Sequence, residues 1–389
     1  MQASTLEKTN HSNEQAGAMK LVIDRAALVR ALGHIQSVVE KRGTIPILSN
    51  VKLDAAGGKL SLTATDMDIA VVETVAANVE AEGSTTVPAH TLYEIIRKLP
   101  DGVEVEVAEE TGGKVSVAAG HARFSLASLA VEDFPVMAEG DFSHSFTIAT
   151  AECSALIDKT RFAISTEETR YYLNGIYFHV AADGDDTVLR AVATDGHRLA
   201  RVQVSLPAGA DGMPGVIIPR KTIAELKKLL ESEVDEVQIS VSESKIRFVC
   251  GNAVLVSKLI DGNFPDYDRV IPSGNDKIME VESKQLMQAV DRVSVIASDK
   301  SRGVKLHLEN GTLALSANSP ENGTANEELE VNYGADAMEI GFNSRYLLEM
   351  MTQIEGETVQ FVLADSTSPA LVRDSADLGA LYVVMPMRV

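Results

Sequence analysis

The run Thr-Asp-Gly-His-Arg at residues 194–198 places a carboxylate and an imidazole close together, as in a general acid-base pair. A hydrolase would also need a nucleophile, but none accompanies Asp195 and His197 at a motif position, and no Gly-x-Ser-x-Gly occurs. Asp-Gly is typical of tight turns, because glycine tolerates positive φ. We therefore interpret this run as a turn and expect no catalytic residue in it.

Two other patterns could bind a phosphate or a metal ion. Gly-Gly-Lys occurs at residues 57–59 and 112–114, but without the upstream glycine and the following Ser or Thr of a phosphate-binding loop. Asp183, Asp185 and Asp186 could hold calcium, yet the run lacks the EF-hand pattern and is typical of an acidic surface turn. The histidines are scattered. We predict no metal site and no cofactor.

Composition narrows the class of protein. The 389 residues are 45% apolar and 23% charged, which is ordinary for a soluble globular protein. No apolar run is long enough for a membrane span, and residues 1–18 lack the features of a signal peptide, so we expect a disordered extension or a tag there. Cys153 and Cys250 lie far apart and predict no disulfide framework, which fits a cytoplasmic protein. The net charge of −21, taken alone, argues against a nucleic-acid partner.

The chain contains an internal repeat. A β run ends in Thr-Asp or Ala-Asn at Asp66, Asp195 and Asn318, at intervals of 129 and 123 residues. A second landmark, a β run followed by Phe-Pro or Met-Pro, recurs at Pro135, Pro265 and Pro386. Because two independent landmarks share one period, we predict three domains, at residues 19–140, 141–270 and 271–389.

Each repeat divides again into two halves. Six times a short β run leads into a segment with apolar residues at i, i+3, i+4 and i+7, which predicts a helix. Several β runs with Gly or Asp-Gly turns follow each helix. The sequence therefore predicts an α+β fold, in which each half-domain is one helix on about four antiparallel strands. The six helical segments with their flanks are 20–42, 87–99, 150–161, 219–231, 280–302 and 343–355.

Charge is distributed unevenly between these segments and the rest of the chain. The helical segments hold 18 Lys and Arg against 13 Asp and Glu, and the remainder holds 17 against 43. A basic helix surface is often no more than a solvated face. The recurrence of the bias favours another arrangement, in which helices line the inside of a ring and sheets form its acidic exterior. A mildly positive lumen would hold duplex DNA loosely and permit sliding.

Several motifs resemble one family. RYYLNGI (170–176), ATDGHRLA (193–200), VIIPRK (216–221), VSKLIDGNFPDY (256–267) and YVVMPMRV (382–389) are similar to the β subunit of bacterial DNA polymerase III, the β sliding clamp. TIPILSN (44–50) and TATDMD (63–68) resemble its first domain. The resemblance implies a non-catalytic ring of two chains, joined head to tail, that encircles duplex DNA.

The resemblance also implies three sites. At the dimer contact, it pairs Phe124 and Leu126 with Ile296 and Ala297. DNA would meet Arg42, Arg170, Tyr171, Tyr172, Arg220 and Lys221, although Glu167 stands where an amide is expected, and Tyr172 could instead be the packed start of a strand. The partner-peptide pocket would contain Leu173, Thr194, Gly196, His197, Arg198, Leu199, Pro265, Arg269, Val270, Asn343, Tyr346, Val383, Met385, Pro386, Met387 and Arg388.

The implied partners are the polymerase III α subunit, the clamp loader, and other polymerases and repair proteins that carry short linear motifs. The alternative for VVMPM (383–387) is merely a last core strand. Two other functions stay open: a repeat-containing α+β enzyme or sugar-binding protein, and an open monomeric scaffold. The enzyme would need a deep polar pocket with perturbed carboxylates.

Overall fold

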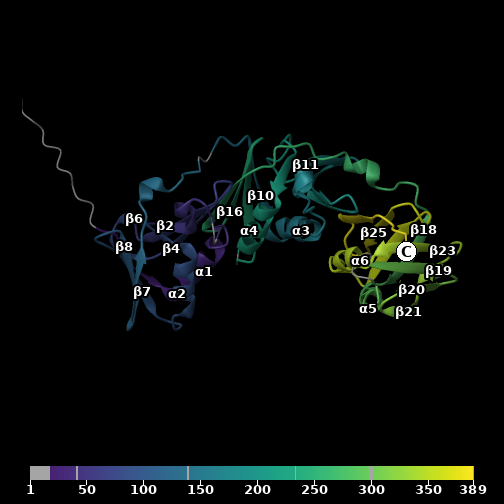
Figure 1. The fold of residues 1–389 in the computed structure, drawn as a ribbon. Helices are drawn as coiled ribbons and strands as arrows, with labels where there is room; N and C mark the ends of the chain where they lie inside the picture. The colour runs from purple at the N-terminus through teal and green to yellow at the C-terminus, as the bar shows by residue number, and fades with distance from the viewer. Residues whose placement is uncertain (1–17, 41–42, 138–139, 233, 298–301, 389) are drawn as a thin grey trace, which may run out of the picture. The chain divides into compact units, whose positions relative to one another are not determined.

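The structure is a computed structural model that describes residues 18–40, 43–137, 140–232, 234–297 and 302–388. Residues 1–17 of the expected extension lie outside this range, and the first strand begins at Lys20. The chain forms two compact units. Figure 1 labels the helices and many of the strands within them. The first is residues 18–137 with Asn252–Leu255, and the second holds the other described residues.

In the described residues, each of the six predicted helices is present, and each follows a strand without an intervening residue. The junctions explain where helices begin. Asp24 accepts a hydrogen bond from the backbone N–H of Ala27, and Asn343 accepts one from that of Arg345, so both are N-caps. The helices are α1 (Arg25–Ile35), α2 (Ala89–Lys98), α3 (Thr150–Arg161), α4 (Arg220–Leu230), α5 (Ser283–Ser294) and α6 (Ser344–Met351).

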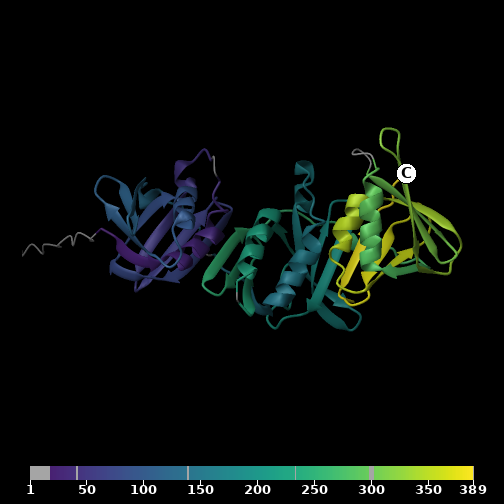
Figure 2. The same cartoon turned by 90° about the horizontal axis from the view of Figure 1, so that it is seen from below.

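The first unit has two antiparallel ladders. Its strands bury alternate residues, as in β3 with Leu60, Leu62 and Ala64, and α1 and α2 lie side by side (Figure 2). One ladder has the order β5 (Asn78–Ala81), β1 (Lys20–Asp24), β7 (Glu104–Glu110), β8 (Lys114–Ala119), β9 (Ala122–Ala127). The other has the order β4 (Ile69–Ala76), β3 (Lys59–Thr65), β2 (Asn50–Ala56), β6 (Gly83–Pro88).

The second unit contains a nine-stranded sheet that joins the second and third repeats. Its order is β14 (Val216–Pro219), β11 (Gly175–Asp183), β12 (Asp186–Thr194), β13 (Arg198–Ser205), β26 (Ala380–Val384), β25 (Ala370–Asp374), β24 (Thr358–Leu363), β18 (Lys277–Glu282), β22 (Asn332–Tyr333). The β13–β26 ladder pairs Leu199 with Val383. Lys159 of α3 reinforces the junction, because its Nζ lies 2.6 Å from Asp377 Oδ2. The two repeats therefore form one compact unit.

The rest of this unit consists of two further sets of paired strands and the helices that pack on them. β10 (His144–Ala149), β15 (Glu236–Val241) and β16 (Lys245–Cys250) form one ladder, and β17 (Ala253–Lys258) follows them in the chain. β21 (Gly323–Glu330), β20 (Thr312–Ser319), β19 (Gly303–Glu309) and β23 (Met338–Asn343) form a four-stranded sheet. Helices α3 and α4 contact each other, as do α5 and α6, and Figure 2 shows α5 beside α6. The predicted α+β half-domains are confirmed.

Short 3-10 helices connect these elements. They are η1 (Pro46–Ser49), η2 (Val131–Asp133), η3 (Glu168–Leu173) and η4 (Tyr267–Val270). Tyr172 lies in η3, and β11 begins only at Gly175, so the alternative that Tyr172 starts a strand is wrong. Among the described helices, none is both long enough and apolar enough to cross a membrane.

Candidate functional site

The turn between β12 and β13 is built by its own polar side chains. Asp195 Oδ1 accepts hydrogen bonds from the backbone N–H groups of His197 at 2.9 Å and Arg198 at 3.0 Å. The Thr194 hydroxyl donates to the Arg198 carbonyl at 2.7 Å and accepts from the Gly196 N–H at 3.1 Å. Asp195 therefore fixes the turn. The interpretation of this run as a turn is confirmed.

Gly196 suits its position because of its backbone conformation. Its φ is +87°, a conformation that residues with a Cβ rarely adopt. A Cβ there would also lie 2.6 Å from Arg170 Nη1. The turn therefore sits directly against the Arg170 side chain, which belongs to the predicted DNA contacts.

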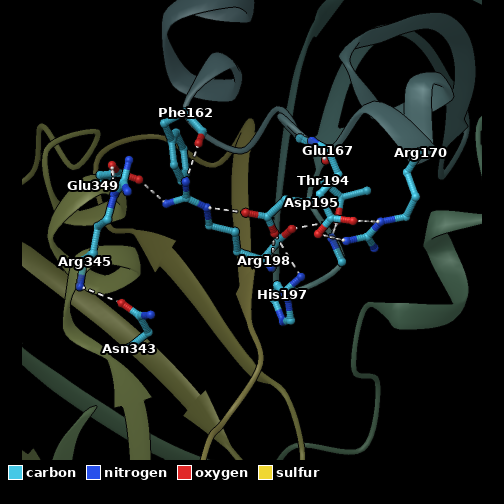
Figure 3. Close-up of polar contacts among 12 residues, drawn as sticks. Phe162, Glu167, Arg170, Thr194, Asp195, His197, Arg198, Asn343, Arg345 and Glu349 are labelled. Atoms are coloured by element: carbon cyan, nitrogen blue, oxygen red, sulfur yellow. Dashed lines mark hydrogen bonds and ion pairs between the residues drawn. The ribbon is translucent and has the colours of Figure 1, made fainter. Parts of the chain in front are cut away.

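Arg198 anchors this turn to the neighbouring repeat. Its side chain is only 8% exposed, and its guanidinium donates to Asp195 Oδ2 at 3.1 Å and to the Phe162 carbonyl at 2.6 Å (Figure 3). The same group donates to Glu349 of α6 and lies 4.5 Å from the ring centroid of Tyr346. Arg198 thus acts inside the protein, because hydrogen bonds and a ring face satisfy its charge there.

Glu349 is shared between two arginines. Besides Arg198, it accepts from Arg345 Nε at 2.8 Å (Figure 3). Burial acts to raise the pKa of Glu349, but the hydrogen bonds from Arg345 and Arg198 outweigh it, so this pKa lies below its ordinary value of 4.5. Glu349 is therefore ionised at neutral pH, as a carboxylate that pairs two cations must be.

A cavity of about 650 Å³ lies beside this network, between α3, α4 and α6. The cavity is polar, as the enzyme alternative would require. However, the hydrogen bond from Arg170 lowers the pKa of Glu167, just as arginines lower that of Glu349, so neither carboxylate suits a general acid. Groups of three or more acidic, His or Cys side chains that could bind a metal ion are absent from the described residues.

The C-terminal segment runs next to the same turn. The backbone N–H of Met385 donates to the His197 carbonyl, and that of Met387 donates to the Gly341 carbonyl, each at 2.8 Å. The His197 and Tyr346 rings stack at a centroid distance of 6.1 Å. Strand β26 ends at Val384, and Met385 is 39% exposed, so the last-core-strand alternative holds only as far as Val384.

The residues predicted for the partner pocket divide by exposure. The interior members are Leu173, Arg198, Leu199 and Val383. Leu199 and Val383 belong to an apolar cluster with Tyr267, on which Phe264 packs. The half-buried members are Thr194, Asn343, Tyr346, Pro386 and Met387. The exposed members are Gly196, His197, Pro265, Arg269, Val270, Met385 and Arg388.

The structure also brings most of the predicted DNA contacts together. Arg220 begins α4, and its backbone N–H donates to the carbonyl of Asn174 at 2.9 Å. Asn174 is the C-cap residue of η3. Tyr171 is 52% exposed and meets Tyr172 edge-on. Glu167 accepts from Arg170 Nε at 2.8 Å and Nη2 at 2.6 Å, so this arginine is already paired. Lys221 follows Arg220, whereas Arg42 lies outside the described residues.

The predicted dimer residues occupy two places, one in each unit. On the edge strand β9, Phe124 is 37% exposed and Leu126 is buried. After α5, Ile296 is half-buried and Ala297 is buried. Val295, beside Ile296, is 75% exposed and was not among the residues predicted for this contact.

Sequence reasoning also missed Phe162, Arg345 and Glu349, which complete the Arg198 network. The sequence contains a signal for only one of these contacts. Arg345 and Glu349 have the i, i+4 spacing of an ion pair on a helix. Glu349 lies 151 positions from Arg198, so no local pattern links them.

Family models decide the identity. Residues 19–138 match the DNA polymerase III beta subunit N-terminal domain, residues 147–266 its central domain, and residues 268–388 its C-terminal domain. The chain belongs to the DNA polymerase III beta subunit family. The three matches follow one another along nearly the whole chain, so the predicted three-fold repeat of clamp domains is confirmed.

Individual relatives agree with the family models. The beta sliding clamp of Caulobacter vibrioides is 53% identical over 372 residues, which are 95% of this chain and 100% of the relative. That of Pseudomonas aeruginosa is 43% identical over 371 residues, with the same coverage. The family is a non-catalytic accessory factor of DNA polymerase III, so the prediction that this chain is not an enzyme is confirmed.

Crystal structures of sliding clamps have the same fold. The C. crescentus beta sliding clamp with bound polyethylene glycol superimposes with a TM-score of 0.93 at 52% identity. The Bartonella birtlesii sliding clamp bound to griselimycin also gives 0.93, at 49% identity. Each comparison covers 96% of this chain and 100% of the other.

Proposed function

We propose that this chain is a DNA sliding clamp, which closes as a head-to-tail homodimer around duplex DNA and tethers polymerases to it. The observation that carries the proposal is the succession of three beta-subunit domains over residues 19–388, matched by sliding clamps along their full length. A tethered polymerase that leaves the primer end rebinds intramolecularly, so processivity rises without tighter binding. Such a clamp works on replicating DNA in the bacterial cytoplasm.

The charge distribution supports loose DNA contact. The helical segments carry a surplus of five positive charges, and some of their arginines are already paired, as Arg97 is with Glu94 and Arg292 with Glu327. A lumen with few free cations would attract duplex phosphates only weakly. In this proposal the helices face the DNA, and the clamp is retained because the closed ring is threaded.

The proposed DNA contacts combine two kinds of side chain. Arg42, Arg220 and Lys221 would meet phosphates, and Arg170 would do so when Glu167 releases it. The exposed Tyr171 ring, with Tyr172 beside it, offers a stacking surface for single-stranded template. The hydrogen bond between the Arg220 N–H and the Asn174 carbonyl supports this grouping, because it holds the start of α4 against η3.

The proposed partner site is the surface formed by the Asp195–Arg198 turn, the segment Met385–Arg388 and η4. The exposed Met385 and Val270 offer apolar contact beside a core of Leu199 and Val383. Short linear motifs of the polymerase III α subunit, the clamp loader, other polymerases and repair proteins would dock there. All sixteen residues predicted from the resemblance remain in the proposal, with Arg198 as an internal anchor.

The proposed dimer contact joins β9 of one copy to the end of α5 of the other. The exposed Phe124 and Val295 supply apolar area at the two places, beside the buried Leu126 and Ala297 and the half-buried Ile296. Pairing the edge strand β9 would also cover its unpaired backbone groups. An open monomeric scaffold would leave both apolar surfaces exposed to solvent, so these surfaces favour the closed dimer.

Primer extension tests the function. The replicative polymerase, the clamp loader and this chain are combined on a singly primed circular template, and product length is measured at limiting polymerase. We expect products much longer than without the chain, and no gain from a variant that lacks Met385–Val389 but still dimerises. Equal product lengths with and without the chain would contradict the proposal.

A further inference from the structure

The nine-stranded sheet carries two arginines in one row on the face away from α3. Arg201 of β13 pairs with Leu381 of β26, and Leu381 pairs with Arg373 of β25, so the three side chains point to the same side. The neighbouring Tyr382 points to the other side, where it meets Phe162 at the end of α3. Because adjacent strands are about 4.8 Å apart, the α-carbons of Arg201 and Arg373 are separated by about 10 Å.

Within the described part of the chain, neither arginine has a hydrogen-bond or ion-pair partner. The Nε of Arg201 is fully buried without an acceptor. Burial lowers the pKa of Arg201, and the nearby charge of Arg190 adds to this effect. A half-buried cation without a paired anion is costly. A ligand cannot reach the buried Nε, but its carboxylate can pair with the Nη groups, which are not among the buried atoms without a partner, and so recover part of that cost.

Arg190, on the same face, is an arginine whose guanidinium does have hydrogen-bond partners. Arg190 Nε donates to Gln203 Oε1 at 2.8 Å, and its Nη2 donates to Asp183 Oδ1 at 3.3 Å. Asp183 also accepts from Gln203, so its carboxylate is occupied by these two residues. Arg201 feels the charges of Asp183 and Asp268, but forms an ion pair with neither among the described residues.

We propose that Arg201 and Arg373 bind an acidic, extended segment of a partner protein. This inference rests on the proposed function, because such a segment would adjoin the motif that docks in the partner site. Leu199 and Val383 of that site lie two residues further along β13 and β26, on the same face and about 7 Å away. Carboxylates spaced along one extended chain can reach both guanidiniums, although Leu381 between them is itself buried in the apolar cluster.

The width of the patch favours a single peptide over a nucleic acid. Beyond Arg373, the row continues to Gln360 of β24 and then to Glu280 of β18, which accepts a hydrogen bond from Gln360. Acidic groups therefore bound the cationic strip on one side at Glu280 and on the other at Asp183 and Asp268. Duplex or single-stranded nucleic acid needs a longer cationic track.

The test uses the full chain and fluorescein-labelled hexaglutamate, with binding followed by fluorescence anisotropy at low salt. For the double variant Arg201→Ala/Arg373→Ala, we expect the dissociation constant to rise about five- to tenfold, since one half-buried and one exposed cation each contribute modestly. The charge-matched control Arg97→Ala/Arg161→Ala removes two exposed arginines that each pair with a carboxylate on their own helix, and should bind like the unmodified chain.

Further arms separate the possible outcomes. Arg201→Gln/Arg373→Gln repeats the measurement with side chains of similar length, in case the alanine variant unfolds. Absence of hexaglutamate binding, or equal losses in test and control variants, would overturn the proposal, as would tighter binding of labelled hexathymidylate that needs the same arginines. Deletion of Met385–Val389 should spare hexaglutamate binding but abolish binding of a polymerase-derived peptide. If the peptide still binds, the partner site is wrong, whereas the arginine site stands.

Discussion

Removing the Glu349 carboxylate should destabilise the second unit. Taking one partner from a buried ion pair typically costs about 3–5 kcal/mol. Arg198 would keep Asp195 and the Phe162 carbonyl, and the Glu349 side chain is 31% exposed, so we expect about 2 kcal/mol for Glu349→Ala. Alanine favours helices, so a loss of helix propensity in α6 cannot account for such a cost.

Equilibrium urea denaturation, followed by near-ultraviolet circular dichroism, measures this cost. The matched control is Arg345→Ala, which removes the other arginine that pairs with Glu349. Since Arg345 is 58% exposed, this change should cost about 0.5 kcal/mol or less. The affinity for a polymerase-derived peptide should fall in Glu349→Ala, because Arg198 holds the His197 turn against Tyr346. Equal destabilisation by the two variants would refute the anchoring role of Arg198.

The same network predicts a dependence on pH. The pKa of Glu349 is lower in the folded protein than its ordinary value of 4.5, so the carboxylate contributes stability above that value. This contribution is lost as the pH falls through the folded pKa. The stability difference between the unmodified chain and Glu349→Gln should therefore be constant near neutral pH and shrink in acid. A difference that grows on acidification would contradict this assignment.

Three further changes test other parts of the account. Gly196→Ala should cost about 1–3 kcal/mol in urea denaturation, because alanine is strained at a φ of +87°; a neutral effect would show that the turn relaxes. Ile296→Asp should yield monomers by light scattering, whereas an unchanged dimer would exclude the proposed contact. Glu167→Gln should free Arg170 and strengthen DNA binding with a steeper salt dependence, and unaltered binding would remove Arg170 from the DNA surface.

The elements were predictable because their signals are local. Apolar spacing marked the helices, and Leu28, Leu32 and Ile35 do form the buried stripe of α1. The Asp-Gly turn was predictable for the same reason, since Asp195 bonds to residues two and three positions ahead. Both signals arise within a few residues, where the chain itself fixes the geometry.

The parts that sequence did not predict depend on long-range contacts. Lys159 and Asp377 are 218 positions apart, and their pairing needs the β13–β26 ladder to exist first. The paired state of Arg170 was likewise hidden, although Glu167 was noticed as a departure. Sequence indicated that an acid lay nearby, but only the backbone of η3 brings both carboxylate oxygens onto the guanidinium.

If threading alone keeps the clamp on DNA, cutting a circular plasmid should release it. The chain is loaded by its clamp loader onto a nicked circular plasmid, isolated by gel filtration, and then treated with an enzyme that cuts the plasmid once. A threaded ring should stay with the uncut circle and leave the linear molecule through its free ends. Equal retention on circular and linear DNA would mean that the protein grips DNA, and would contradict the account.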